Sequence, residues 1–566
     1  MTISIPSSCL SRSLICVLEL EPDTLVALTR FISRFGNVSS CFRETTIRVI
    51  SYILSNSLVP FAFEFPKHES LLCFLHSIKI PGCFFSVFTC IQNIPLIIPF
   101  PVKSLELSYY DDDEFFSPNF ITKKIENFLS INNFQNVTKF ETVFDHNNFS
   151  FDFIPIYLPC LTSLKLTSLD PNNFSESNVV LPFGLSALSF LEISWSGYTL
   201  DVSNLVSLKS LICRGNLLDS AKLIGLNFLN ELTILQIFHV EISSELNPFT
   251  RLELFRAYGL KADSLSFLFN NYDNFENCRI VFISCYSLNF TDWNFQSKMI
   301  ELAVNDSTFS FRDGPPLFSL KSFSTLESLK ITCRSIESLR IELPDVFNLT
   351  ILQCWYLKFN LLFSLLSRSK FLRKLVIAKT NLPAPISLFS FDYLHELSLI
   401  EVKGFFELFS VMPRVKILVL TQVSDFDMSF INKSFPVLKQ LYMNDCSLGT
   451  GIFESNFSVN ELHLRFSLNW NEDIFILLSH FNNLFILDLF VPLNVGVNFF
   501  ELPSNVRRIR CDVPLGVLKN SVQNLPRLEV LVGSLFCDEN FNELELKDFV
   551  SSLLSDVFCS LKVVFL

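Results

Sequence analysis

The stretch "FPVLKQLYMNDCSL" (residues 435–448) contains a cysteine whose type alone permits chemistry, because a thiolate can act as a nucleophile or bind a metal. Catalysis or zinc binding would require partners at defined spacing. The chain has 16 cysteines, but it contains no Cys-x-x-Cys and no Cys/His set with zinc spacing. Cys446 therefore has to be interpreted from the leucines around it, and the cysteines as a group are expected to be buried thiols.

Other residues that could carry chemistry are isolated. The sequence contains no Gly-x-Ser-x-Gly, no Walker loop and no His-Glu-x-x-His, and the segment "GTGIFE" (449–454) lacks the third glycine of a dinucleotide fingerprint. The acidic run 111–114 could attract a cation, but a solvated loop is the simpler interpretation. The histidines are scattered singly, as His239, His395 and His463 illustrate. The sequence thus predicts no enzyme activity, no cofactor and no metal site.

Composition limits the partners. The net charge is −12, and the densest basic spot, Arg507, Arg508 and Arg510, is expected to be an exposed strand edge, so a nucleic acid is not expected as a partner. Residues 80–102 are uncharged and long enough to span a bilayer, but their four prolines favour buried strands with prolines in the turns. We therefore expect no membrane contact, no signal peptide and a cytoplasmic or nuclear location.

A repeat accounts for most of the chain. The pattern L-x-x-L-x-L recurs with first positions at 349, 372, 394, 415, 438, 459, 484, 506 and 528, which are 21 to 25 residues apart. Less regular copies begin at 161, 188, 208, 232 and 252, and weaker ones occur from residue 75 onward. The second and third apolar positions are two apart, so both point to one face of a short strand, and one unit can bury that face only by stacking on its neighbours.

This pattern resembles the leucine-rich-repeat family over roughly residue 75 to the end. The resemblance implies an α/β fold: a solenoid with a curved parallel β-sheet on the concave face and short helices or 3₁₀ turns on the convex face. Proline repeatedly precedes the strand, as at Pro436, where it ends the preceding helix. The position after the strand, usually Asn or Cys in this family, is Thr380 or Cys446 in some repeats and Val402 or Val423 in others. We therefore expect an irregular solenoid in which Cys446 is a buried turn residue.

Residues 1–70 lack the repeat, and 71–566 are predicted to form the solenoid. Helical spacing of Leu25, Leu28 and Ile32 predicts short N-terminal helices. Segments within residues 22–54 resemble parts of the F-box that precedes leucine-rich repeats in budding yeasts, although Glu21 replaces the leading leucine and the usual tryptophan is absent. The resemblance implies a ubiquitin-ligase adaptor bound at 22–54. The alternative is a helical cap that shields the first repeat.

The residues between the buried leucines are predicted to face the concave side. Exposed aromatic and arginine side chains of this kind dominate protein–protein interfaces. We therefore predict a non-enzymatic module that binds a protein partner on this face, as a substrate receptor of a cullin-type ubiquitin ligase. The alternatives are a regulatory or structural scaffold and a secreted or surface repeat protein. The candidate partner-binding residues are Arg214, Gln236, Phe238, Arg256, Tyr258, Trp355, Tyr442, His463, Arg465, Asp488 and Phe490.

Overall fold

The structure is a computed structural model in which the chain divides into two units, residues 1–276 and 277–566, described separately below. The described residues are 62–65, 85–91, 98, 102–108, 118–144, 151–168, 179–195, 199–215, 221–242, 251–260, 278–285, 300–305, 317–320, 325–332, 340–342, 348–357, 359–380, 382, 391–403, 411–423, 429–446, 458–465, 481–490, 503–511, 525, 527–533 and 562–565.

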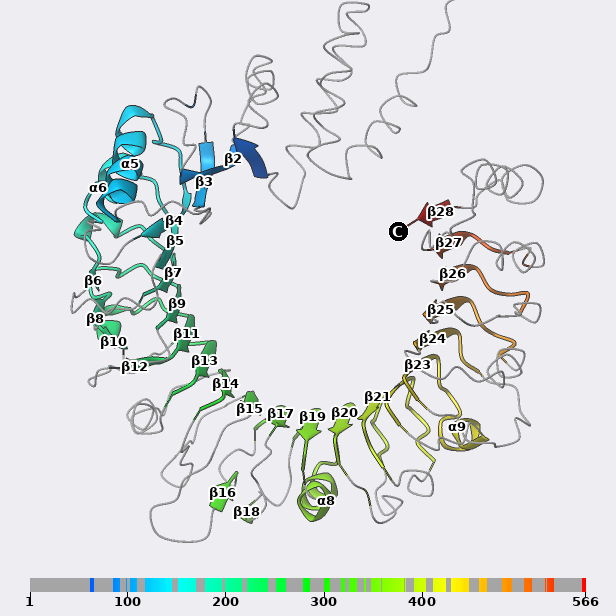
Figure 1. The fold of residues 1–566 in the computed structure, drawn as a ribbon. Helices are drawn as coiled ribbons and strands as arrows, with labels where there is room; N and C mark the ends of the chain where they lie inside the picture. Colours follow the sequence, from blue (N-terminus) through cyan, green and yellow to red (C-terminus); the bar gives the residue numbers. More distant parts are fainter. Residues whose placement is uncertain are drawn as a thin grey trace, which may run out of the picture. The chain divides into compact units, whose positions relative to one another are not determined.

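Unit 1 is built on one parallel sheet whose strands pair in chain order (Figure 1). Consecutive repeats supply neighbouring strands, because each short strand can bury its leucines only against the next. The strands are β1 (Ala62–Phe65), β2 (Phe85–Cys90), β3 (Val102–Ser108), β4 (Lys139–Phe144), β5 (Ser163–Ser168), β7 (Phe190–Ser194), β9 (Ser210–Arg214), β11 (Ile234–Phe238) and β13 (Leu254–Tyr258).

The outer side of unit 1 carries helices and a second sheet. The helices α5 (Pro118–Ile131) and α6 (Phe153–Tyr157) and the 3₁₀ turns η2 (Phe183–Leu185) and η3 (Leu226–Phe228) were anticipated by the repeat pattern. The second parallel sheet, in the order β6–β8–β10–β12, was not. Its strands are β6 (Val179–Val180), β8 (Thr199–Asp201), β10 (Ala221–Ile224) and β12 (Val240–Ile242).

Unit 2 repeats the arrangement with a parallel sheet in chain order (Figure 1). Helices α8 (Phe359–Arg368) and α9 (Ser429–Ser434) and the strand pair β16 (Leu317–Ser319) and β18 (Arg340–Glu342) lie outside this sheet. The sheet strands are β14 (Arg279–Ile283), β15 (Glu301–Asn305), β17 (Ser328–Thr332), β19 (Ile351–Trp355), β20 (Lys374–Ala378), β21 (Glu396–Ile400), β22 (Ile417–Thr421), β23 (Gln440–Asn444), β24 (Glu461–Arg465), β25 (Ile486–Phe490), β26 (Arg508–Cys511), β27 (Val530–Gly533) and β28 (Lys562–Phe565).

The buried leucines of the repeat form continuous columns, which confirms the predicted leucine-rich-repeat solenoid. Leu375, Leu397, Leu418 and Leu441 occupy equivalent register positions on β20 to β23, and each is 0% exposed. Full burial of a leucine side chain contributes roughly 1.5–3 kcal/mol. The repeat therefore supplies one such contribution per strand, and Leu441 cannot be shortened without leaving a cavity.

Several strands end in a turn with a left-handed residue. His239, Tyr356, Lys379, Glu401 and Asp445 are among those with φ between 48° and 60°. The backbone N–H of each donates to the carbonyl at the end of the next strand, for example from Lys379 to Ile400 at 2.7 Å. This interstrand bond holds a conformation that costs an L-residue roughly 1–2 kcal/mol, and it turns the chain away from the sheet.

The residue that follows the left-handed residue in these turns is buried, as predicted for Cys446. The Cys446 thiol is 6% exposed and donates weakly to the Asn444 carbonyl, with Sγ 3.4 Å from the oxygen. Thr380 does the same with its hydroxyl at 2.9 Å from the Ala378 carbonyl, whereas Val402 and Val423 fill the position with an apolar side chain. The hydrogen-bonding ladder is thus incomplete, as the sequence predicts.

Only part of the N-terminal prediction can be compared with the described residues. The predicted helices and F-box-like segment at 22–54 lie outside the described residues. Strand β1 pairs with β2, so the parallel array includes residues 62–65, which precede the expected boundary at residue 71. Within the uncharged segment 80–102 the chain forms β2, in agreement with buried strands, and no helix in the described ranges is long and apolar enough to cross a membrane.

Candidate functional site

Strand alternation creates a solvent-facing surface on each sheet. In β23, Leu441 and Met443 are buried, whereas Gln440, Tyr442 and Asn444 are only partly buried and share the opposite face. Register pairing aligns equivalent residues of neighbouring strands into rows, so that Tyr442 lies beside His463 and His463 beside Asp488. We call the row of third strand residues the central row and the row of fifth residues the end row.

The predicted partner-binding residues all fall on these two rows. Those in the central row are Gln236, Arg256, Tyr442, His463 and Asp488, and those in the end row are Arg214, Phe238, Tyr258, Trp355, Arg465 and Phe490. In unit 1 they gather on β9, β11 and β13, which we call the unit-1 patch. In unit 2 they gather on β23 to β25, the unit-2 patch, and Trp355 stands apart on β19. All of them lie on the face opposite the buried leucines, and their binding role stays a prediction.

In the unit-1 patch, Arg214 contacts both a carboxylate and an aromatic ring. The Arg214 Nε donates to Glu192 Oε1 at 3.1 Å, and its guanidinium carbon lies 4.4 Å from the centroid of the Phe238 ring. The Phe238 and Tyr258 rings follow with centroids 5.8 Å apart. The arginine thereby satisfies a carboxylate and covers an aromatic face at once.

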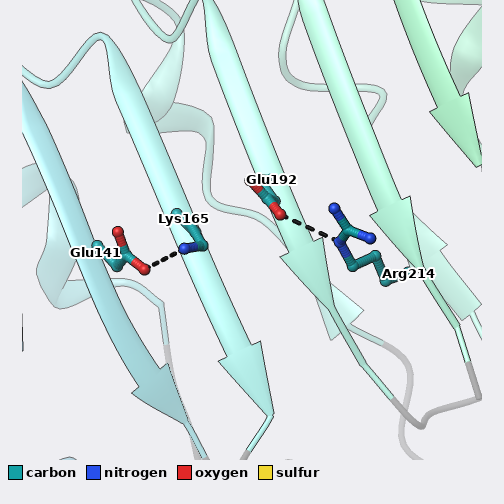
Figure 2. A network of polar contacts seen from close by, with 4 residues as sticks. All are labelled: Glu141, Lys165, Glu192 and Arg214. Carbon is teal, nitrogen blue, oxygen red and sulfur yellow. Dashed lines mark hydrogen bonds and ion pairs between the residues drawn. The ribbon is translucent and has the colours of Figure 1, made fainter. Parts of the chain in front are cut away.

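A second ion pair extends this network across the neighbouring strands. Lys165 on β5 donates to Glu141 on β4, next to the Glu192–Arg214 pair (Figure 2). The hydrogen bond to Glu141 raises the pKa of Lys165. The pKa of Glu106 on β3 is also raised, first by desolvation and then by repulsion from Glu141. The sequence prediction missed these charged residues, although each occupies the same between-leucine position as the residues it named.

The unit-2 patch is organised around a stacked ring pair. The Tyr442 and His463 rings lie 4.1 Å apart at 5°. The Nδ1 of His463 is 2.8 Å from Asp488 Oδ2, and its Nε2 is 3.9 Å from Glu461 Oε2. One imidazole is therefore flanked by two carboxylates. Desolvation raises the pKa of Tyr442, with further contributions from Glu461, Asp488 and Glu396.

The basic spot at 507–510 was expected to be an exposed strand edge, and the structure contradicts this. It is no strand edge, because β26 pairs with both β25 and β27. Arg507 is exposed and pairs with Glu529 at 3.5 Å, whereas the Arg510 guanidinium carbon lies 5.3 Å from the Phe490 ring centroid. Arg510 thus joins the unit-2 patch, which a register-based search of between-leucine positions could have found.

Most described cysteines are buried as expected, and Cys160 differs because it is exposed. Desolvation raises the pKa of the Cys446 thiol, and burial raises those of Cys213 and Cys354 strongly. A thiol with a raised pKa is a poor nucleophile at neutral pH. Across the described ranges, no group of three or more His, Cys, Asp or Glu side chains is placed to hold a metal ion.

The chain resembles solved leucine-rich-repeat structures at low identity. No family model and no curated protein matches it. An internalin (inlF) from Listeria monocytogenes is 15% identical, with 69% of this chain and 90% of that chain covered and a TM-score of 0.30. CroV588, described as a circular leucine-rich-repeat protein, is 13% identical over 86% of this chain and 73% of that chain, with a TM-score of 0.30. The plant peptide hormone receptor RGFR1, solved with RGF2, is 13% identical over 90% and 86% respectively, with a TM-score of 0.28.

Proposed function

We propose that the chain is a non-enzymatic interaction scaffold that binds a protein partner on the strand faces of its solenoid. The observation that carries this proposal is the gathering of aromatic and arginine side chains into the two patches. Between the buried columns, Arg214, Phe238 and Tyr258 form one contiguous surface, and Tyr442, His463 and Phe490 contribute to another. Side chains of these types on a rigid sheet need little ordering when a partner binds.

Affinity capture with the full chain tests this proposal. One bait carries Arg214→Ser and Tyr258→Ser, and a second carries Tyr442→Ser and Phe490→Ser. Since aromatic and arginine anchors each contribute about 2 kcal/mol or more at interfaces, at least one bait should lose a specific partner about tenfold or more. The matched control is Phe183→Ser, an exposed aromatic on η2 outside the main sheet. A partner lost with the control and kept by both patch variants would contradict the proposal.

The sharper version of the proposal is a substrate receptor of a cullin-type ubiquitin ligase in the cytoplasm or nucleus. It depends on residues 22–54, which lie outside the described residues, and on the F-box-like resemblance alone. Co-purification of the adaptor with the full chain, and its loss on changing Leu25, Leu28 and Ile32 to Ser, would support it. Retention of the protein partner without any adaptor would favour the rival scaffold, in which the N-terminal segment only caps the repeats.

A further inference from the structure

The carboxylates of the strand faces differ in their partners. Glu141 and Glu192 pair with Lys165 and Arg214 in unit 1, and in unit 2 Lys374 pairs with Glu396 at 2.7 Å. Glu461 and Asp488 have no lysine or arginine within 4.0 Å among the described residues. Among the described residues, their ion-pair partner within 4.0 Å is His463 alone, which carries a charge only when protonated. The unit-2 patch therefore holds two carboxylates that no lysine or arginine among the described residues approaches within 4.0 Å, although Arg510 follows Asp488 on the next strand.

These carboxylates sit around an aromatic platform. The His463 ring stacks on Tyr442 and presents its two nitrogens to Asp488 and Glu461, so the carboxylates flank one ring. We call Tyr442, Glu461, His463 and Asp488 the acidic-aromatic cluster. Asp488 Oδ1 has no hydrogen-bond partner and is shielded from solvent. A donor that reaches this oxygen after a small rotation of the carboxylate would make a hydrogen bond that the unbound protein lacks.

The central row is uncharged on the β22 side of the cluster, whereas on the β26 side Arg510 follows Asp488. Tyr442 lies next to Val419 in the central row, and Ser398 and Val376 continue the row across β21 and β20. A segment bound here can place apolar side chains on this row and a cation at the cluster. Desolvation raises the pKa of Tyr442 most, and the negative charges of Glu461, Asp488 and Glu396 raise it further.

We propose that the acidic-aromatic cluster receives an arginine side chain of a protein partner, which rests on the proposed function of the strand faces. A guanidinium is planar, stacks on aromatic rings and donates from two sides, so it can bridge the carboxylates that flank His463. Lysine supplies the charge without the planar fork. An anionic segment is the opposite possibility, since Arg465 and Arg510 lie on the neighbouring positions.

Nuclear magnetic resonance on the full chain, labelled with ¹³C in its histidine rings, tests the proposal. The His463 signal is assigned by its loss in His463→Gln. Titration with N-acetyl-arginine amide should move this signal with a dissociation constant on the order of millimolar. N-acetyl-citrulline amide, which has the same shape without the charge, should leave it in place. Asp488→Asn should weaken the arginine titration about tenfold.

The matched control is Glu192→Gln, which neutralises a carboxylate that already has an arginine partner and should leave the titration unchanged. An equal response to citrulline, a stronger response to N-acetyl-aspartate amide, or no response of His463 to arginine would each overturn the inference. These outcomes are separable from the proposed function. The bait with Tyr442→Ser and Phe490→Ser could lose a partner that the Asp488→Asn bait still captures fully. That result would leave the scaffold proposal intact and contradict the proposed binding of a partner's arginine.

Discussion

The strand faces of the two units place different contacts at the same positions of the repeat. On unit 1, Glu192 and Arg214 satisfy each other, and Arg214 also covers Phe238. On unit 2, the ion-pair partner of Asp488 among the described residues is His463, and Glu461 lies 3.9 Å from the same ring. Glu192 thus has an arginine within 4.0 Å, whereas the group that meets Asp488 is an imidazole that is charged only when protonated. The difference shows that residues at equivalent positions of a repeat need not make the same contacts.

The two units differ on their outward faces, but each contains columns of fully buried leucines. Leu211→Ala in unit 1 and Leu441→Ala in unit 2 should therefore each lower the free energy of unfolding by about 3 kcal/mol, since both side chains are fully buried. Hydrogen exchange of the surrounding strands measures the loss in each unit. The control Tyr442→Ala, on the outward face, should cost about 1 kcal/mol or less. A twofold difference between the leucine variants would break the comparison.

The turns after the strands offer a second contrast. Gly259 in unit 1 has φ +66°, and an added Cβ would lie 2.1 Å from Cε1 of His239, so Gly259→Ala should destabilise by about 1–2 kcal/mol. Gln422 in unit 2 adopts φ 51°, so Gln422→Gly should stabilise by about 0.5–1 kcal/mol. Urea denaturation followed by circular dichroism measures both changes. Equal signs for the two substitutions would show that the turns are not equivalent.

The ion pairs give a smaller and sharper test. Glu192→Gln should lower the free energy of unfolding by about 0.2–1 kcal/mol, because it leaves Arg214 without its carboxylate at a partly exposed site. Asp488→Asn should change it by no more than that, since an amide oxygen can still accept from His463 Nδ1. The two variants should separate in the arginine titration, where only Asp488→Asn has an effect. A larger stability loss for Asp488→Asn would mean that its carboxylate supports the fold.

The smallest expected effect is a pH dependence in unit 1. Partial burial lowers the pKa of His239, so the unfolded state binds more protons between the lowered value and the ordinary pKa near about 6.5. The free energy of unfolding should therefore fall as pH drops through this window. His239→Asn, which tolerates the left-handed turn, should reduce that slope in urea titrations at several pH values. An unchanged slope would assign the pH dependence to other groups.

Much of the fold was predictable because the repeat is a local pattern. Leu375 and Leu441 could be assigned to a buried column from spacing alone, and Cys446 to a buried turn position. The second sheet of unit 1 was missed because strands such as β6 (Val179–Val180) are too short to show an alternating pattern. The sequence also predicts that the basic spot at β26 is a strand edge. The local pattern indicates a strand there, but it does not show that β25 and β27 pair with it on both sides.

The sequence by itself determined the solenoid, its buried columns and the identity of the residues on the outward face, because a two-residue alternation and a period of 21 to 25 residues leave few other ways to bury the leucines. Only the tertiary structure decided which of those outward residues meet. Arg214 is 22 residues from Glu192, and His463 is 25 residues from Asp488. Whether such residues pair depends on strand register and side-chain orientation, which set distances of a few ångströms that no spacing along the chain specifies.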